Sequence, residues 1–283
     1  MLFKCLGIIV LLVGLMIVEL NRFRVTDYTI HSGKLKNKCV VLFLTDLHGK
    51  TFRGRLLNKI TTLKPDYILI GGDVITKKKP KELSPMADFV IALQKIAPVY
   101  YGFGNHETTI DSILGVADME YGKAFSEYLK KITEAGVTIL RNETVNLRED
   151  LALSVLELPV PYYKKMKHIT LSKEEMMGFI KMPQANGFKI LMAHHPVFAD
   201  TYRHLNINLM LCGHTHGGLI RFPFIGSIIS TELLWFPKYD GGIYEIQNEN
   251  EKLPLVVSKG LGYHSYPIRI LNRAEAVRVY LEP

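Results

Sequence analysis

Cysteine is scarce in this chain of 283 residues, which contains only Cys5, Cys39 and Cys212. All three lie in apolar segments, where free cysteine packs as a small hydrophobic residue. They provide neither a disulfide framework nor a CxxC zinc knuckle. The sequence also lacks a patch of interleaved basic and aromatic residues, which counts against a nucleic-acid partner. The net charge of +8 therefore points to a phosphorylated substrate or an anionic membrane surface.

Long apolar runs are also rare, and the longest lies at the N-terminus. It spans residues 1–20, contains Lys4, and is followed by Arg22 and Arg24. No small-residue cleavage site follows it, so we expect residues 1–24 to form an uncleaved membrane anchor rather than a removed signal peptide. Because basic residues flank both ends, the positive-inside rule leaves the side of the membrane open.

The rest of the chain, residues 25–283, contains no internal repeat, low-complexity segment or obvious linker, and we predict a single domain. Apolar runs of strand length alternate with amphipathic segments of helical length, which predicts an α/β fold. The buried strands are expected at residues 39–44, 67–70, 99–102, 188–193 and 209–212, and shorter strands at 138–140, 145–147, 151–158, 242–245, 255–257 and 276–281. Helices are expected at 56–63, 85–96, 124–135 and 172–180, with Ser84 and Ser172 near their starts and Gly136 as a C-cap.

The five buried strands end in polar clusters of one chemical type. These are Asp46 with His48, Asp73, Asn105 with His106, His194 with His195, and His214 with His216. Ligands of open α/β sheets bind beyond the carboxyl ends of the strands, so the clusters predict one shared site. Carboxylates, an amide and imidazoles without a thiolate suit Mn, Fe or Zn. They are too many for one tetrahedral ion, and two divalent ions sharing a carboxylate would use them all. Each cluster alone also fits an ordinary turn, and it is their combination that favours a metal site.

This series of motifs resembles the calcineurin-like metallophosphoesterase superfamily from about residue 40 to the C-terminus. The run Gly-His-Thr-His-Gly-Gly at 213–218, with the segments 221–223 and 258–262, resembles a membrane-associated bacterial branch that includes phosphodiesterases. The resemblance implies a four-layer α/β/β/α sandwich of two mixed sheets. It also implies two metal sites that share the bridging ligand Asp73, the first with Asp46, His48 and His216, and the second with Asn105, His194 and His214.

The resemblance gives His106 a catalytic role over the leaving group rather than a metal-binding one. Glu107 stands where many members have aspartate, and a carboxylate there is expected to orient His106 and favour its protonated form. Two ions about 3.5–4 Å apart lower the pKa of a bridging water. The resulting hydroxide attacks phosphorus in line, and His106 stabilises the developing charge or protonates the departing oxygen.

We therefore predict a dimetal hydrolase of phosphate esters that favours a phosphodiester or pyrophosphate-type substrate over a simple monoester. The substrate is expected to be a phosphorylated small molecule or a lipid headgroup. Segments 159–165 and 233–239 carry aromatics and lysines and are candidates for the pocket rim, although plain loop packing explains them equally well. Two alternatives remain, a membrane-anchored binding protein without turnover on the same fold and a nuclease. The complete set of ligand positions favours the enzyme.

The adjacent residues His194 and His195 cannot both face the metals, because successive strand residues point to opposite sides. Two arguments select His194. It holds the first position of the His-x-Pro pattern of the family that this segment resembles, and His195 precedes Pro196, which favours an extended backbone leading away from the site. We predict that His194 binds metal and that His195 lies behind it or at the rim.

Overall fold

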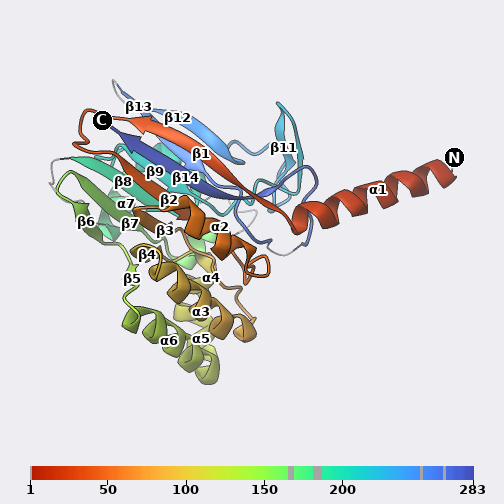
Figure 1. Cartoon of the computed structure of the whole chain (residues 1–283), viewed down its shortest axis with the longest axis horizontal. Helices are drawn as coiled ribbons and strands as arrows, with labels where there is room; N and C mark the ends of the chain where they lie inside the picture. Colours follow the sequence, from red (N-terminus) through yellow and green to blue (C-terminus); the bar gives the residue numbers. More distant parts are fainter. Residues whose placement is uncertain (1, 165–168, 181–186, 249–250, 264–265) are drawn as a thin grey trace.

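The layering of the molecule follows from the alternation of side chains along its buried strands. In strand β2 (Cys39–Leu44), Leu42 and Leu44 pack against helices, whereas Val41 and Phe43 pack against a second sheet. The computed structural model describes residues 2–164, 169–180, 187–248, 251–263 and 266–283. Within them, three apolar cores separate four layers, helices, sheet, sheet and helices (Figure 1).

The first sheet is mixed and has six strands. Their order is β1 (Phe23–His31), β14 (Ala274–Glu282), β2, β3 (Tyr67–Ile70), β4 (Val99–Gly102) and β5 (Thr138–Leu140). All neighbours are parallel except β14 and β2. Its outer face is covered by α2 (Arg55–Leu63), α3 (Leu83–Gln94) and α6 (Met119–Glu134).

The second sheet is also mixed and has six strands. Their order is β12 (Gly242–Asn248), β13 (Glu251–Val257), β9 (Leu209–Cys212), β8 (Phe188–Ala193), β7 (Leu151–Leu156) and β6 (Thr144–Arg148). The four central strands are parallel, and the two edge strands are antiparallel to their neighbours. Helices α7 (Lys173–Phe179) and α8 (Ala199–Tyr202) cover its outer face. The predicted four-layer α/β/β/α sandwich is confirmed.

Short elements complete the described chain at the edges of the sandwich. Helices α4 (Asn105–Thr109) and α5 (Gly115–Ala117) are joined by a π-helical turn and lead into α6. Strands β10 (Ile220–Phe222) and β11 (Gly226–Ile229) form a small hairpin beyond the second sheet (Figure 1).

Some element boundaries differ from those that the sequence predicts. Helix α3 begins at Leu83, directly after a short helical turn, so Ser84 lies inside the helix and does not cap it. Helix α6 begins at Met119, where Asp118 accepts a hydrogen bond from the backbone N–H of Tyr121 at 3.0 Å. The capping box of Ser172 and the left-handed Gly136 after α6 are confirmed. The segment 159–165 contains a helical turn at Val160–Tyr163, and its residue 165 lies outside the described part.

The N-terminal apolar run forms helix α1 (Leu2–Leu20), which projects from the sandwich (Figure 1). Within the described part of the chain, no helix combines the length and apolarity needed to cross a membrane. The structure therefore gives no support to the predicted spanning anchor.

Candidate active site

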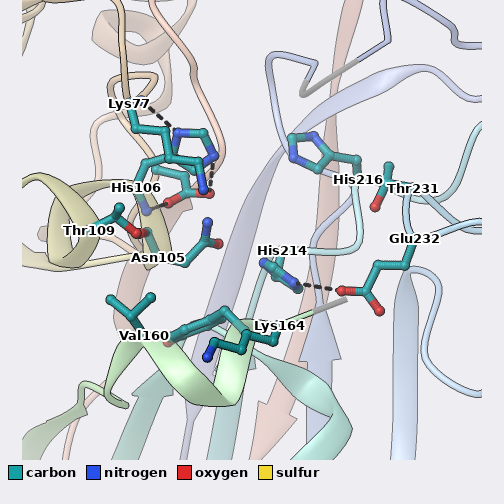
Figure 2. A pocket seen from close by; sticks show the side chains of 12 residues that line it. Lys77, Asn105, His106, Thr109, Val160, Lys164, His214, His216, Thr231 and Glu232 are labelled. Atoms are coloured by element: carbon teal, nitrogen blue, oxygen red, sulfur yellow. Dashed lines mark hydrogen bonds and ion pairs between the residues drawn. The ribbon is translucent and has the colours of Figure 1, made fainter. Parts of the chain in front are cut away.

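All eight predicted site residues meet where strands of the two sheets end. The loops after β2 and β3 are joined by backbone hydrogen bonds from Asp46 N–H to the Gly72 carbonyl at 3.0 Å and from His48 N–H to the Asp73 carbonyl at 3.1 Å. The side chains form overlapping groups of potential metal ligands. Asn105 lines the adjoining cavity, as Figure 2 shows. The fold thus brings together the five strand ends that were expected to share a site.

Asp73 occupies the centre of the group. Its Oδ1 accepts a hydrogen bond from the backbone N–H of His106 at 2.8 Å. Its Oδ2 faces three imidazoles, with distances to Nε2 of 3.3 Å for His194, 3.7 Å for His48 and 3.9 Å for His106. One oxygen therefore fixes the carboxylate, and the other lies between ligands from both sheets.

Asp46 is held in a similar way at the neighbouring strand end. Its Oδ2 accepts hydrogen bonds from the Thr45 hydroxyl at 2.9 Å and from the backbone N–H of His214 at 3.0 Å. Its Oδ1 lies 3.4 Å from Nε2 of His216 and 3.8 Å from Nε2 of His194. This oxygen thus faces the same space as Oδ2 of Asp73, because His194 is close to both.

The backbone carries strain at these positions. Five predicted ligands have left-handed conformations, with φ from 46° to 68°, namely Asp46, His48, Asp73, His214 and His216. The left-handed region costs an L-residue on the order of 1–2 kcal/mol. Such strain is concentrated at functional sites, where the surrounding fold maintains it. The fold thus stabilises a convergence of side chains that the local backbone disfavours.

Two glycines make this convergence sterically possible. A Cβ atom at Gly104 would lie 2.3 Å from Asp73 Oδ1, and one at Gly213 would lie 2.5 Å from Asp46 Oδ2. Both distances are far below a van der Waals contact. A side chain at either position would therefore displace a carboxylate of the site.

The donor geometry fits divalent cations. His194 Nδ1 donates a hydrogen bond to the Gly71 carbonyl at 2.7 Å, which leaves a lone pair on Nε2 of the neutral ring. That lone pair faces the carboxylates of Asp73 and Asp46, an arrangement that is repulsive unless a cation or proton lies between them. Asn105 Oδ1 is buried and has no hydrogen-bond partner within the described residues. The site is thus a set of lone pairs directed at a common space.

Burial and neighbouring charges have opposite effects on the pKa values of these groups. Burial disfavours the charged form of His194, but the carboxylates of Asp73 and Asp46 outweigh it and raise the pKa of the imidazole to about 10. Burial also raises the pKa of Asp73, yet His106 and His194 reverse the effect and hold it well below its usual range. Burial dominates at Asp46 and raises its pKa. Metal binding replaces such protons, because cations compete for the same lone pairs.

His106 presents a hydrogen-bond donor to the cavity. Its Nδ1 accepts a hydrogen bond from the backbone N–H of Lys77 at 2.7 Å (Figure 2). The ring proton of the neutral imidazole therefore lies on Nε2. This differs from the protonated form expected from the sequence, because an imidazolium would direct a second N–H at the Lys77 amide.

Glu107 has a different role from the predicted one. Its carboxylate is fully buried and accepts hydrogen bonds from the backbone N–H groups of Asp73, Val74, Ile75 and Gly104 and from the Tyr101 hydroxyl, at 2.8 to 3.3 Å. Burial and the neighbouring Asp73 raise the pKa of this carboxyl to about 7. Because all five partners donate, Glu107 accepts them best in its deprotonated form. It therefore joins the loops after β3 and β4 as a carboxylate.

We expect Glu107→Gln to lower the free energy of unfolding by roughly 3 kcal/mol, because an amide cannot accept all five bonds and directs a donor at a donor. Denaturant titration of chelator-treated protein measures the change. Glu127→Gln makes the same substitution on the exposed face of α6 and should be neutral. Equal stability of the two variants would contradict this role for Glu107.

His195 lies next to the cluster, grouped with His214 and Glu232 rather than with Asp46 and Asp73. Its ring stacks on Tyr163 with centroids 5.8 Å apart and an interplanar angle of 14°. It also lies 4.2 Å from the ring of His214. Burial, with the nearby rings of His214 and His194, holds its pKa well below the usual range. The structure thus places His194 against both carboxylates and His195 behind His214.

Comparison with known proteins relates this geometry to a family. The model of the calcineurin-like phosphoesterases matches residues 39–218, which contain all eight site residues. The chain belongs to the calcineurin-like phosphoesterases. Phosphodiesterase YaeI of Escherichia coli (strain K12) is 30% identical over 216 residues, covering 74% of this chain and 70% of YaeI. The uncharacterized metallophosphoesterase YkuE of Bacillus subtilis (strain 168) is 28% identical over 223 residues, covering 76% of this chain and 68% of YkuE.

A third relative bears a name that refers to a membrane. The transmembrane protein with metallophosphoesterase domain of Bos taurus is 25% identical over 262 residues, covering 87% of this chain and 53% of the relative. Family membership makes this phosphoesterase a phosphoric ester hydrolase, as predicted. Together with the Asp and His clusters, it supports a dimetal centre.

Two residues around the phosphoesterase site, Thr231 and Glu232, were not predicted. Glu232 Oε1 lies 3.6 Å from Nε2 of His214, and Thr231 lines the same cavity (Figure 2). Tyr163 lies over the rings of His194, His195 and His214. Thr231 and Glu232 follow no buried strand, so no strand-end pattern marks them. Tyr163 belongs to the segment that the sequence suggested for the rim.

Proposed function

We propose that this chain hydrolyses phosphodiester or pyrophosphate-type substrates with two divalent ions. Asp46, His48 and His216 would hold one ion, and Asn105, His194 and His214 the other, with Asp73 shared between them. Support comes from the position of Asp73 Oδ2 and Asp46 Oδ1, which face imidazoles of both groups. Bound ions of this kind activate water and neutralise phosphate charge.

The protein itself contributes substrate binding and a hydrogen-bond donor. The cavity beside the cluster has a volume of about 280 Å³ and is lined by Lys77 and Lys164, whose positive charge suits phosphate oxygens. His106 lines the same cavity from α4, and its Nε2 lies 3.9 Å from Asp73 Oδ2. We assign to this group a hydrogen bond from Nε2–H to the departing oxygen, which stabilises the negative charge that develops there.

The preference for a diester rests on a second cavity. It has a volume of about 130 Å³, adjoins the first through His214, Thr231 and Glu232, and is lined by apolar side chains such as Val197 and Leu234. A monoester places one substituent beside the phosphate, whereas a diester or pyrophosphate places one on each side. Two adjoining cavities accommodate both substituents, and the apolar one suits a lipid-like group.

Metal removal tests the hydrolytic function. Dialysis against a chelator is expected to abolish turnover, and added Mn²⁺, Fe²⁺ or Zn²⁺ should restore it. Bis(p-nitrophenyl) phosphate and p-nitrophenyl phosphate form a matched pair with the same leaving group, and we expect the diester to be hydrolysed faster. Full activity of protein shown to be metal-free by elemental analysis would contradict the dimetal proposal. A faster monoester reaction would contradict the substrate preference alone.

The choice between adjacent histidines has its own test. His194→Ala is expected to lose a metal equivalent and nearly all turnover, because its lone pair faces Asp73 at 3.3 Å and Asp46 at 3.8 Å. His195→Ala should retain both ions, because its ring stacks on Tyr163 instead. Elemental analysis of both purified variants measures the difference. The reverse pattern would show that the ligand assignment at the end of β8 is wrong.

A further inference from the structure

Two neighbouring turns beside the active site expose an unusual number of large apolar side chains. We call them the apolar lip, which consists of Phe222, Phe224, Ile225, Leu233, Leu234, Trp235 and Phe236, all between 45% and 109% exposed. The turns form one unit, because Ile229 pairs with Trp235 and the backbone N–H of Phe236 donates to the Ile228 carbonyl at 3.0 Å. Contiguous apolar surface of this kind marks an interaction site.

The backbone of the lip directs these side chains outward at a cost. Phe224, Leu233 and Phe236 have φ values of 68°, 63° and 46°, in the left-handed region that favours glycine. Bulky apolar residues at such positions are strained, and their exposure to water adds a hydrophobic penalty. Ordinary turn residues would remove both costs. The sequence therefore retains apolar side chains at the tips for a purpose other than stability.

Basic residues lie on one flank of the lip. A cavity of about 380 Å³ adjoins Phe222 and is lined by Arg24, Arg221, Lys259 and Arg273, with Glu19 as its acidic member. The side chains of Arg24 and Arg273 are 51% and 42% exposed, and each also pairs with a carboxylate, Arg24 with Glu275 at 3.5 Å and Arg273 with Glu19 at 3.2 Å. Apolar tips beside exposed arginines match the two layers of an anionic bilayer surface, acyl chains below and phosphate groups above.

The lip also borders the catalytic cavity. Thr231 and Glu232, which line that cavity, directly precede Leu233, and Leu234 lines the adjoining apolar cavity. In Figure 1, β11 and α1 lie on the same side of the sandwich. A surface that receives the lip would therefore lie next to the mouth of the active site.

We propose that the apolar lip inserts into the surface of an anionic lipid bilayer, with Arg24 and Arg273 facing the headgroup phosphates. This contact is separate from hydrolysis, so its test does not depend on whether the proposed function is correct. It also does not require a spanning helix. It would give the active site access to phosphoesters at the bilayer surface.

The chain contains a single tryptophan, Trp235, which lies in the lip and provides a local probe. We expect vesicles of phosphatidylcholine with phosphatidylglycerol to shift its emission in the chain of residues 1–283 to shorter wavelength, and brominated lipids to quench it. Pure phosphatidylcholine should do so much more weakly. Sedimentation alone is insufficient, because α1 also exposes apolar side chains such as Val10 and Leu11.

Paired variants test the two parts of the contact. Phe224→Ser with Ile225→Ser should weaken the lipid dependence of Trp235 emission on the order of tenfold or more, since each side chain leaves apolar surroundings. Val116→Ser with Met119→Ser, at exposed positions of the α5–α6 region, should change nothing. Arg24→Gln with Arg273→Gln should reduce the preference for phosphatidylglycerol. Hydrolysis of bis(p-nitrophenyl) phosphate should be unchanged in all three.

Three outcomes would overturn the proposal. If neither vesicle type changes the emission of Trp235, the lip does not contact lipid. If lipid changes the Trp235 emission of the Phe224→Ser, Ile225→Ser variant as much as that of the unaltered protein, the same conclusion follows. A shift that depends on protein concentration without lipid, with a dimer in light scattering, would assign the lip to self-association.

Discussion

Asp73→Asn is expected to abolish turnover and to reduce the bound metal. The substitution keeps the shape of the side chain, and the amide oxygen can still accept the backbone N–H of His106. The amide nitrogen then takes the place of Oδ2 and directs hydrogens at the imidazoles of His48 and His194. A donor at this position cannot be shared by two cations. Metal ions contribute several kcal/mol to transition-state stabilisation, so we expect kcat to fall by roughly 10³-fold or more.

Asp66 supplies the matched control, because it lies directly before β3 whereas Asp73 follows the same strand. Asp66 is exposed and accepts the backbone N–H of Val40 at 2.7 Å. Asp66→Asn should retain both ions and full turnover. Elemental analysis and circular dichroism on both variants separate loss of metal from loss of fold. An active, folded Asp73→Asn protein with two ions would exclude the bridging role.

The sequence predicts the central strands, and the clustering of polar residues at their ends, well because one physical rule governs both. A strand buried on both faces must be a continuous apolar run, and its polar end is then conspicuous. In β9, Leu211 packs between the sheets and Cys212 under the outer helices, so both are apolar, and His214 follows within two residues. The identities of the clustered residues follow from such strand ends.

The strands at the edges of the molecule do not follow this rule, because they are not buried on both faces. Strand β1 carries Arg24, Asp27 and other polar residues on an edge that is largely exposed, and it pairs with β14 about 250 residues later in the sequence. Strands β10 and β11 are held by turns rather than by a buried face. In β1 the apolar and polar residues alternate only over short stretches, and β10 and β11 are too short to show a period. Their placement depends on partners that only the folded chain brings together.

The role of Glu107 was hidden for a related reason. Its four backbone partners belong to the turns after β3 and β4, and their N–H groups converge only because Gly104 allows the turns to touch. A motif places Glu107 beside His106 in sequence but does not reveal the direction of its side chain. The donor that orients His106 is the backbone amide of Lys77. A pattern of side chains cannot predict a hydrogen bond from the backbone.

His106→Asn is expected to lower kcat by about 10²–10³-fold, the usual contribution of a positioned hydrogen-bond donor to developing negative charge, with metal content unchanged. The imidazole Nδ1 already accepts the Lys77 amide, so the ring offers Nε2–H to the cavity rather than a lone pair to a cation. The identity of the leaving group sharpens the test. An alkyl leaving oxygen develops more negative charge than p-nitrophenolate and depends more on this hydrogen bond, so the variant should lose much more activity on an alkyl diester than on bis(p-nitrophenyl) phosphate. Equal losses on both substrates would show that His106 does not act on the departing oxygen, and loss of a metal equivalent would show that it is a ligand.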